Sequence, residues 1–114
     1  MAGWYRQLYY RSVPVDTVAV QLGITVDDLD AMIAAGDLVM VDGPAGPRLP
    51  GWQLTDTGPL PGIRRVTDVF PGGPLRISGW ATAPNPMLHD RTPAAALADG
   101  DVVAVIAAAR AVPS

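Results

Sequence analysis

The hydrophobic residues in the first quarter of the chain recur at the spacing of short helices. Apolar and aromatic side chains within residues 4–9 fall on one helical face, and Val13-Pro14 should end this helix because proline disfavours helix in the residue before it. A second helix is predicted over Thr17–Leu22, with Asp16 as its cap and Gly23 as its left-handed stop. The pattern therefore predicts two short helices separated by a proline break.

A third helix is predicted directly after this stop. Thr25 is a good N-cap for a helix over Val26–Ala35, Asp28 stands three residues on as its capping-box partner, and Gly36 can end the helix. The predicted buried face consists of Leu29, Met32 and Ile33. A helix, a glycine-centred turn and a capped helix make the helix-turn-helix pattern.

The residues after the third helix predict a two-stranded wing. Leu38–Val41 is a short apolar run that ends at Asp42-Gly43, a strong turn signal. Arg48–Leu54 would return as the partner strand, although Pro50-Gly51 restricts it to an edge or a bulge. We therefore predict a winged helix-turn-helix over residues 1–57.

The second half, residues 58–114, is predicted to be a compact helical module. Prolines and glycines divide it into four short helices, and Thr92-Pro93 and Gly100-Asp101 are strong helix-start signals. The predicted helices are Ile63–Phe70, Leu75–Thr82, Ala94–Ala98 and Val102–Ala111. No repeat or linker separates the halves, so we expect one shared core. The predicted fold class is α+β, mostly α.

The composition fits a folded domain and excludes several classes of protein. The 114 residues are 49% hydrophobic and 17% charged, which is too apolar for a disordered chain. Cysteine is absent, which excludes disulfides and thiol nucleophiles, and no apolar run is long enough to span a bilayer. Every basic residue is Arg and every acidic residue is Asp, a bias typical of GC-rich coding sequences such as those of actinobacteria. We expect a cytoplasmic protein.

The net charge of −3 argues against a protein whose whole surface binds phosphates, so any DNA contact would need a local cluster. The candidate DNA-binding residues are Arg6, Arg11, Thr25, Arg48, Arg64 and Arg65. The predicted recognition helix instead carries Asp27, Asp28 and Asp30, which would repel a polyanion. We favour the interpretation that these aspartates complement the helix dipole on a solvated face, with major-groove contact as the alternative.

No residue pattern is typical of a catalytic or metal site. His89, the single histidine, stands beside Asp90, but no glycine-framed nucleophile accompanies it, so a surface-loop histidine is favoured over a hydrolase triad. The aspartates at 27–30 lack the further converging oxygens that a hard cation needs. We predict that the protein is not an enzyme and uses no cofactor or metal.

Four aromatic residues near the start of the chain suggest an exposed anchor. They are Trp4, Tyr5, Tyr9 and Tyr10. Because an apolar patch on so small a domain often marks an interface, we expect a symmetric homodimer.

The most distinctive run of the chain is Gly79–Asn85. Trp80 is expected to close a helix, Pro84 to stop it, and Asn85-Pro86 to turn Met87-Leu88 back toward the core. A simple packing corner would account for every one of these residues.

This run and the segments after it resemble the C-terminal toxin-binding module of the Xre/MbcA/ParS antitoxin family. The matching segments are Leu88, Arg91–Pro93, Ala96-Leu97, Asp99–Asp101 and Val105. The resemblance covers about residues 75–111, and Arg48–Leu54 is similar to the wing strand before the module in family members without the larger Xre domain. Small mycobacterial winged-helix DNA-binding proteins have a similar layout. Ala81 departs from the family pattern, which often has a bulky residue there.

The resemblance implies an antitoxin that binds and neutralises a RES-domain toxin, an NAD-consuming protein, by covering its active-site entrance. Autoregulation through operator DNA would accompany this activity. The toxin-binding residues implied are Arg110, Val112, Pro113 and Ser114. The residues implied to shape the module are Trp80, Pro84, Asn85, Leu88 and Pro93.

The residues themselves leave two alternative functions open. A winged-helix transcription regulator would place the arginines on DNA phosphates, and its affinity would fall steeply with salt. A phage or host adaptor with a degenerate helix-turn-helix would bind only protein, which best explains the acidic helix.

Overall fold

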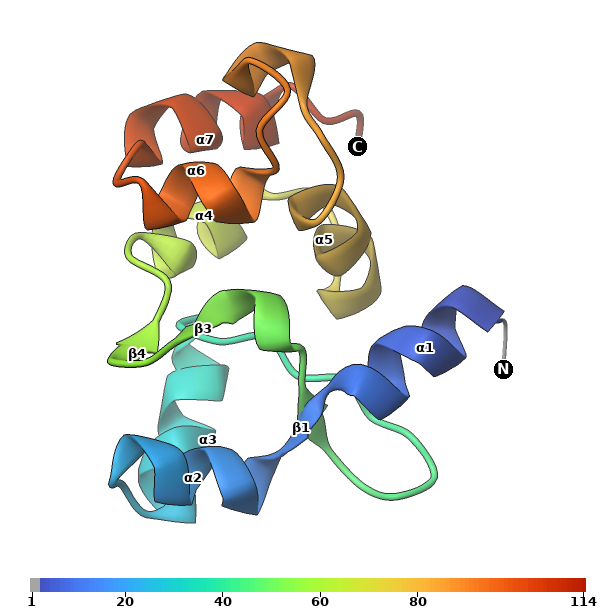
Figure 1. The fold of residues 1–114 in the computed structure, drawn as a ribbon, viewed down its shortest axis with the longest axis vertical. Helices are drawn as coiled ribbons and strands as arrows, with labels where there is room; N and C mark the ends of the chain where they lie inside the picture. The colour runs from blue at the N-terminus through green and yellow to red at the C-terminus, as the bar shows by residue number, and fades with distance from the viewer. Residues whose placement is uncertain (1–2) are drawn as a thin grey trace.

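The computed structural model describes residues 3–114, apart from the Tyr5 side chain, and shows a mostly helical α+β fold (Figure 1). Its α-helices are α1 (Gly3–Arg11), α2 (Val15–Leu22), α3 (Val26–Ala35), α4 (Ile63–Val69), α5 (Pro74–Ala81), α6 (Pro93–Ala98) and α7 (Val102–Arg110). Two 3-10 helices are η1 (Gly51–Gln53) and η2 (Pro86–Leu88). The strands are β1 (Val13–Pro14), β2 (Arg48–Leu49), β3 (Leu54–Thr55) and β4 (Gly58–Pro59). Within residues 3–114, no helix is long and apolar enough to cross a membrane.

The α2–turn–α3 unit forms where the sequence predicts two helices. Gly23 ends α2 in the left-handed conformation at φ 69°, and the Thr25 hydroxyl accepts the Asp28 N–H at 3.0 Å as the N-cap of α3. The predicted Asp16 cap is wrong. Pro14 occupies the N-cap position in an extended conformation, and Asp16 lies inside the first turn, where it accepts the Thr17 N–H.

The predicted wing hairpin is reduced to a single β-bridge between Val41 and Arg48. Their backbone groups exchange hydrogen bonds of 2.8 and 2.9 Å. Strand β2 pairs instead with β1 in an antiparallel register that places Val13 opposite Leu49. After Pro50 the chain turns into η1, so the predicted strand over Arg48–Leu54 ends early.

A buried glutamine explains why Leu38–Val41 is not a strand. The Gln53 side chain accepts the Val39 N–H and donates to the Val39 carbonyl, both at 2.7 Å. Its carboxamide therefore satisfies the two backbone groups that a partner strand would otherwise pair. Gln53 is completely buried, so these bonds form away from water.

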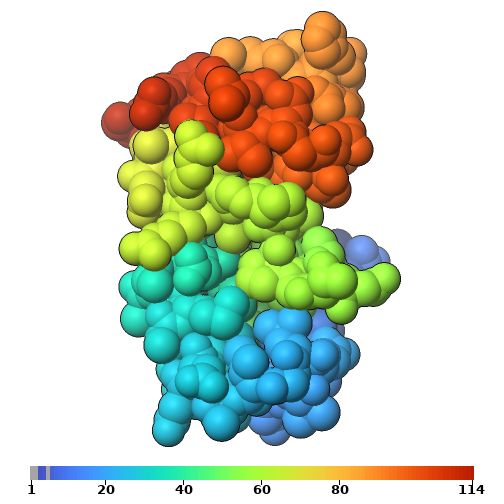
Figure 2. All heavy atoms as spheres, turned by 90° about the vertical axis from the view of Figure 1, so that its left-hand side faces the viewer, coloured from blue at the N-terminus to red at the C-terminus, as the bar shows by residue number. Residues whose placement is uncertain are grey.

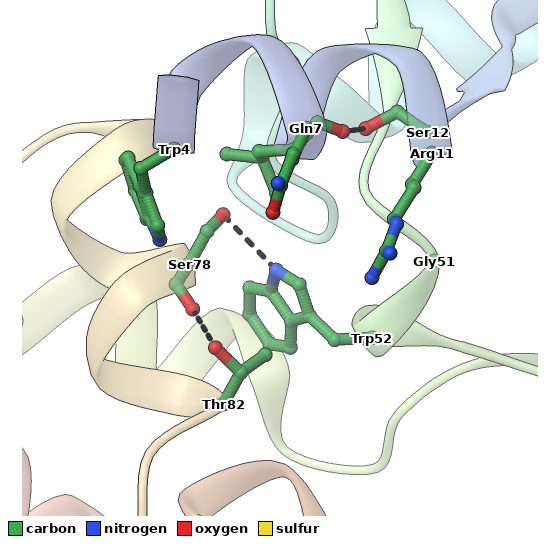
Figure 3. Close-up of a pocket in the computed structure, with 9 residues that line it drawn as sticks. Trp4, Gln7, Arg11, Ser12, Gly51, Trp52, Ser78 and Thr82 are labelled. Carbon is green, nitrogen blue, oxygen red and sulfur yellow. Dashed lines mark hydrogen bonds between the residues drawn. The ribbon is translucent and has the colours of Figure 1, made fainter. Parts of the chain in front are cut away.

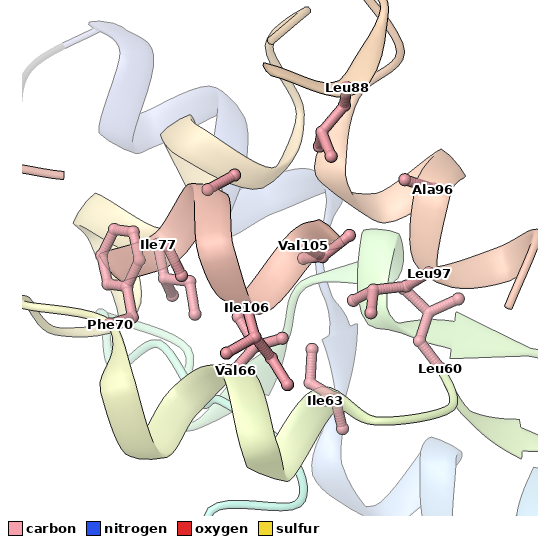
Figure 4. Close-up of a cluster of buried hydrophobic side chains, with 12 residues drawn as sticks. Leu60, Ile63, Val66, Phe70, Ile77, Leu88, Ala96, Leu97, Val105 and Ile106 are labelled. Carbon is pink, nitrogen blue, oxygen red and sulfur yellow. The ribbon is translucent and has the colours of Figure 1, made fainter. Parts of the chain in front are cut away.

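The second half closes around its own apolar core, in which α4 lies along α7 and α6 packs beside them (Figure 4). The buried members of this core are Leu60, Ile63, Val66, Phe70, Ile77, Leu88, Ala96, Leu97, Val105, Ile106, Ala108 and Ala109. The four predicted helices of this half are confirmed to within a residue or so at each end.

The apolar core is divided into two clusters, where the sequence predicts one. The first-half cluster is formed by Val15, Val18, Ala19, Leu29, Leu38 and Leu49. Val39 and Trp52, from the first half, pack against the second cluster. The division arises because α2 and α3 bury their apolar faces against each other, while α4–α7 enclose theirs separately.

Candidate functional site

A surface hollow of about 410 Å³ lies between α4 and α7 and combines an apolar floor with arginines. Figure 2 shows the segments of these two helices meeting on one face of the molecule. The residues that line this α4–α7 groove are Arg65, Asp68, Val69, Val103, Ile106, Ala107 and Arg110.

Helical spacing explains why these residues share one groove. The three from α4 are at positions i, i+3 and i+4, and the four from α7 are at i, i+3, i+4 and i+7. Such positions form one stripe along a helix. Gly62, immediately before α4, lets the helices approach because an added Cβ would lie 2.7 Å from a methyl group of Val102. The groove is therefore a product of close α4–α7 packing.

The charges and the exposure of the groove suit a protein partner with carboxylate groups. Arg65 and Arg110 are both exposed, and neither guanidinium group forms a hydrogen bond or ion pair with the described residues. With Asp68 also in the lining, the two guanidinium groups leave a net positive charge. Val103 is 75% exposed, so the same lining also contains an uncovered apolar side chain.

The C-terminal tail after α7 is attached to the module by Arg76. Its guanidinium donates to the carbonyls of Pro71 and Pro113 and lies 6.0 Å from the centre of the Phe70 ring. Val112 packs partly buried against the second core, whereas Ser114 is exposed. Of the predicted toxin-binding residues, Arg110 thus lines the groove, while Val112 and Pro113 fix the tail.

The predicted DNA-binding residues do not form one surface. Arg48 makes two hydrogen bonds to the Ser12 carbonyl, at 3.1 and 2.7 Å, and lies over the Tyr9 ring, so its role is internal. Thr25 caps α3. Arg6 and Arg11 lie on α1, Arg64 and Arg65 lie on α4, and Arg11 and Arg65 line separate hollows.

The α3 helix carries exposed acidic side chains, whereas a DNA-recognition helix would be expected to carry basic ones. Asp27, Asp28 and Asp30 are all exposed, and the first two lie in its first turn. Their position suits the positive end of the helix dipole, as expected for a solvated face.

The residues predicted to shape the module lie largely where expected. Trp80 packs on Phe70 with ring centroids 5.1 Å apart, Leu88 is completely buried, and Pro93 is buried in the first turn of α6. The Asn85 side chain accepts the Met87 N–H and so caps η2.

One detail of this corner differs from prediction. Met87 is 54% exposed, because the 3-10 turn brings only Leu88 inward. Pro84 is exposed and follows the end of α5, and the helix ends before it, where a stop was predicted.

Arg91 connects the corner to the start of α7. It donates to Asp101 at 2.8 Å and to Asp99 at 3.2 Å, and these hydrogen bonds raise the pKa of Arg91, that to Asp101 more strongly. The Asp101 side chain therefore pairs with Arg91 and makes no hydrogen bond as the cap of α7, although Asp101 occupies the N-cap position.

The aromatic cluster predicted to form a dimer anchor is divided by the fold. Tyr9 is completely buried: its hydroxyl donates to the Gly46 carbonyl at 2.7 Å and accepts the Ala45 N–H. Trp4 and Tyr10 remain about half exposed, six positions apart on α1, and the Tyr5 side chain lies outside the described part. The homodimer stays a prediction, which light scattering can test.

Comparison with known proteins gives information about the fold alone. No protein-family model and no curated protein sequence matches the chain. The NMR structure of Rv2175c is similar, with a TM-score of 0.74 and 20% sequence identity over 88% of this chain and 79% of that chain. At this identity, the likeness shows that the two chains share an overall fold.

Proposed function

We propose that this chain is an antitoxin-like protein that neutralises a partner by binding it through the α4–α7 groove and the C-terminal tail. The observation that carries the proposal is that Arg65 and Arg110 line one groove together with the exposed Val103. An exposed apolar side chain can be buried when a partner binds, and the two guanidinium groups can each bind a carboxylate of that partner. The absence of cysteine is in keeping with a cytoplasmic protein.

The resemblance of residues 75–111 to the antitoxin family supplies the class of partner, a RES-domain toxin. In this proposal Arg110 pairs with acidic groups that otherwise serve the substrate of the toxin. The tail that follows then covers the active-site entrance, and Arg76 fixes its direction through the Pro113 carbonyl.

A direct test is inhibition of NAD consumption by a purified RES-domain toxin, with increasing amounts of the full chain. The charge reversals Arg65→Asp and Arg110→Asp should each weaken inhibition by about tenfold or more, because each leaves an acidic group facing acid. Arg64→Asp is the matched control, since Arg64 is exposed on the same helix but does not line the groove. Unchanged NAD consumption at a large excess of the chain would refute the proposal.

A winged-helix DNA-binding regulator is the second candidate function. The α2–turn–α3 arrangement with its Thr25 cap favours it, as do the exposed arginines of α1 and α4. The three exposed aspartates of α3 and the internal role of Arg48 count against it.

Fluorescence anisotropy with a duplex from the chain's own upstream region separates these functions. DNA binding through phosphates should weaken steeply with salt, and Arg6→Ala or Arg64→Ala should reduce the slope by about one unit per lost contact. Salt-insensitive or absent binding would remove the regulator and operon autoregulation together. If the chain neither inhibits the toxin nor binds DNA, the results would favour the adaptor that binds only protein.

A further inference from the structure

A second hollow, of about 360 Å³, opens between α1, η1 and α5 and is lined by aromatic, amide and cationic groups (Figure 3). We propose that this α1–α5 hollow is a binding site for a small aromatic carboxylate. Its lining residues are Trp4, Gln7, Leu8, Arg11, Ser12, Gly51, Trp52, Ser78 and Thr82. It shares no lining residue with the α4–α7 groove, so the two proposals stand or fall separately.

One face of α1 provides the recognition groups on one side of the hollow. Trp4, Gln7 and Arg11 follow the i, i+3, i+7 spacing of a single helical stripe. In Figure 3 their side chains extend from α1 toward Ser78 and Trp52 on the other side. The Cα atoms of the first and last of the three are about 10 Å apart along the helix, from a rise of about 1.5 Å per residue. This span suits a small planar molecule with an acid at one end.

Trp52 forms a fixed wall opposite α1. Its indole N–H donates to the Ser78 hydroxyl at 3.0 Å, and that hydroxyl donates in turn to the Pro74 carbonyl at 2.6 Å. The indole is half-buried and packs against the second core. An aromatic surface that is already held in place can stack on a planar ligand at little cost in side-chain entropy.

The charge of the hollow selects an anion. Arg11 is exposed, its guanidinium group has neither a hydrogen bond nor an ion pair within residues 3–114, and no acidic residue lines the hollow. A positive concave site in a chain of net charge −3 is a local reversal of sign. A guanidinium group binds a carboxylate in bidentate fashion, and the free Gln7 amide can donate a further hydrogen bond.

The volume and composition indicate a small ligand. About 360 Å³ lies at the lower end of the range for small-molecule sites, which are mostly apolar with a few placed polar groups. Gly51 contributes open space, since a Cβ added there would meet no atom within 4 Å. Because α1 and α5 come from different halves of the chain, a bound ligand would contact both.

The test is titration of the full chain with 1-naphthoate, followed through the three tryptophan indole N–H signals in NMR spectra. Saturable shifts of the Trp4 and Trp52 signals are expected, with little change at Trp80, which does not line the hollow. The neutral isostere 1-naphthalenemethanol should bind about tenfold or more weakly, because it lacks the charge that pairs with Arg11.

Variants assign the effect to the hollow. Arg11→Gln should lower naphthoate affinity about tenfold, to the level of the alcohol, whereas Arg6→Gln, on the same helix but outside the hollow, should leave it unchanged. Gly51→Leu should block binding by filling the space, with thermal stability of the free protein retained. In wild type, naphthoate should also raise the melting temperature, since it binds the folded chain.

Shifts that do not saturate would overturn the proposal. Equal affinities for 1-naphthoate and 1-naphthalenemethanol would also overturn it, as would an equal loss of naphthoate affinity in Arg11→Gln and Arg6→Gln.

Discussion

The Gln53 carboxamide forms with the Val39 backbone the same pair of hydrogen bonds that two neighbouring strand residues exchange. Both bonds are 2.7 Å long, and the glutamine is completely buried. A side chain thus takes the place of a partner strand at Val39, whereas Val41 pairs with the Arg48 backbone. Since Val39 also packs against the second core, this pair connects the two halves of the chain.

Gln53→Leu should therefore destabilise the fold severely. Leucine has a similar side-chain volume, but it leaves the partly buried Val39 N–H and carbonyl without partners, at a cost of about 2–5 kcal/mol in free energy of unfolding. Urea denaturation followed by circular dichroism measures this cost. Gln21→Leu, on the exposed surface of α2, is the control and should change stability little. Equal stability of the two variants would show that the Gln53 bonds contribute nothing.

Gly43→Ala should destabilise the loop between Val41 and Arg48, which the β-bridge of these two residues closes. A Cβ at Gly43 would lie 2.5 Å from the Tyr9 ring, which cannot retreat easily because its hydroxyl is bonded to Gly46 and Ala45. We expect a loss of about 1–3 kcal/mol from overpacking, measured as a shift of the denaturation midpoint.

Gly51→Ala is the control for this loss, because its Cβ would meet no atom within 4 Å and its φ is not positive. If both alanine variants unfold at the wild-type midpoint, the close approach of Gly43 to Tyr9 is not a constraint.

Thr92 and Asp101 both occupy N-cap positions, but their substitutions should respond differently to salt. The Thr92 hydroxyl accepts the Ala95 N–H at 3.1 Å, so Thr92→Ala should cost about 1 kcal/mol at any ionic strength. Asp101 pairs instead with Arg91 on the partly exposed surface. The effect of Asp101→Ala should therefore diminish as salt screens the pair.

Thermal unfolding of the Thr92→Ala and Asp101→Ala variants at low and high sodium chloride concentration measures this difference. Arg91 itself introduces no pH dependence near neutrality. Its pKa is raised in the folded chain, so its contribution is lost only as pH rises through that pKa, far into the alkaline range. A loss of stability that depends on salt in Thr92→Ala, or one that does not depend on salt in Asp101→Ala, would contradict this assignment of roles.

Arg76→Ala should release the C-terminal tail without unfolding the module. The substitution removes two exposed hydrogen bonds, to the Pro71 and Pro113 carbonyls, and the contact with the Phe70 ring. Amide exchange and 15N relaxation should report greater motion at residues 111–114, with α4 and α7 unchanged. Arg64→Ala is the matched control. A tail that stays as rigid as in wild type would show that Val112 packing alone holds it.

Local sequence signals predicted most of the helices correctly. The Thr25 and Thr92 caps and the glycine stops at 23 and 36 act within four residues of the groups they satisfy. Such signals survive in any tertiary context that permits a helix. The Asp16 prediction was wrong because Pro14, already extended in β1, allowed α2 to begin earlier.

The candidate sites were predicted less well, because they depend on residues far apart in the chain. Arg65 and Arg110 were assigned to different partners, yet the packing of α4 on α7 places them in one groove. Asp68 and Val103 were not singled out, although their helical spacing from these arginines was visible in the sequence. The α1–α5 hollow, which joins Trp4 and Trp52, had no sequence signal.

By itself, the sequence determined the α-helices, most of their ends and a mostly helical α+β fold, since spacing and capping depend on near neighbours. The tertiary structure alone decided which backbone groups pair and which arginines stay available. A buried polar group must find a partner wherever the fold supplies one, so Val39 pairs with Gln53 and Arg48 with Ser12. No local pattern encodes those choices, because they follow from which segments the apolar core brings together.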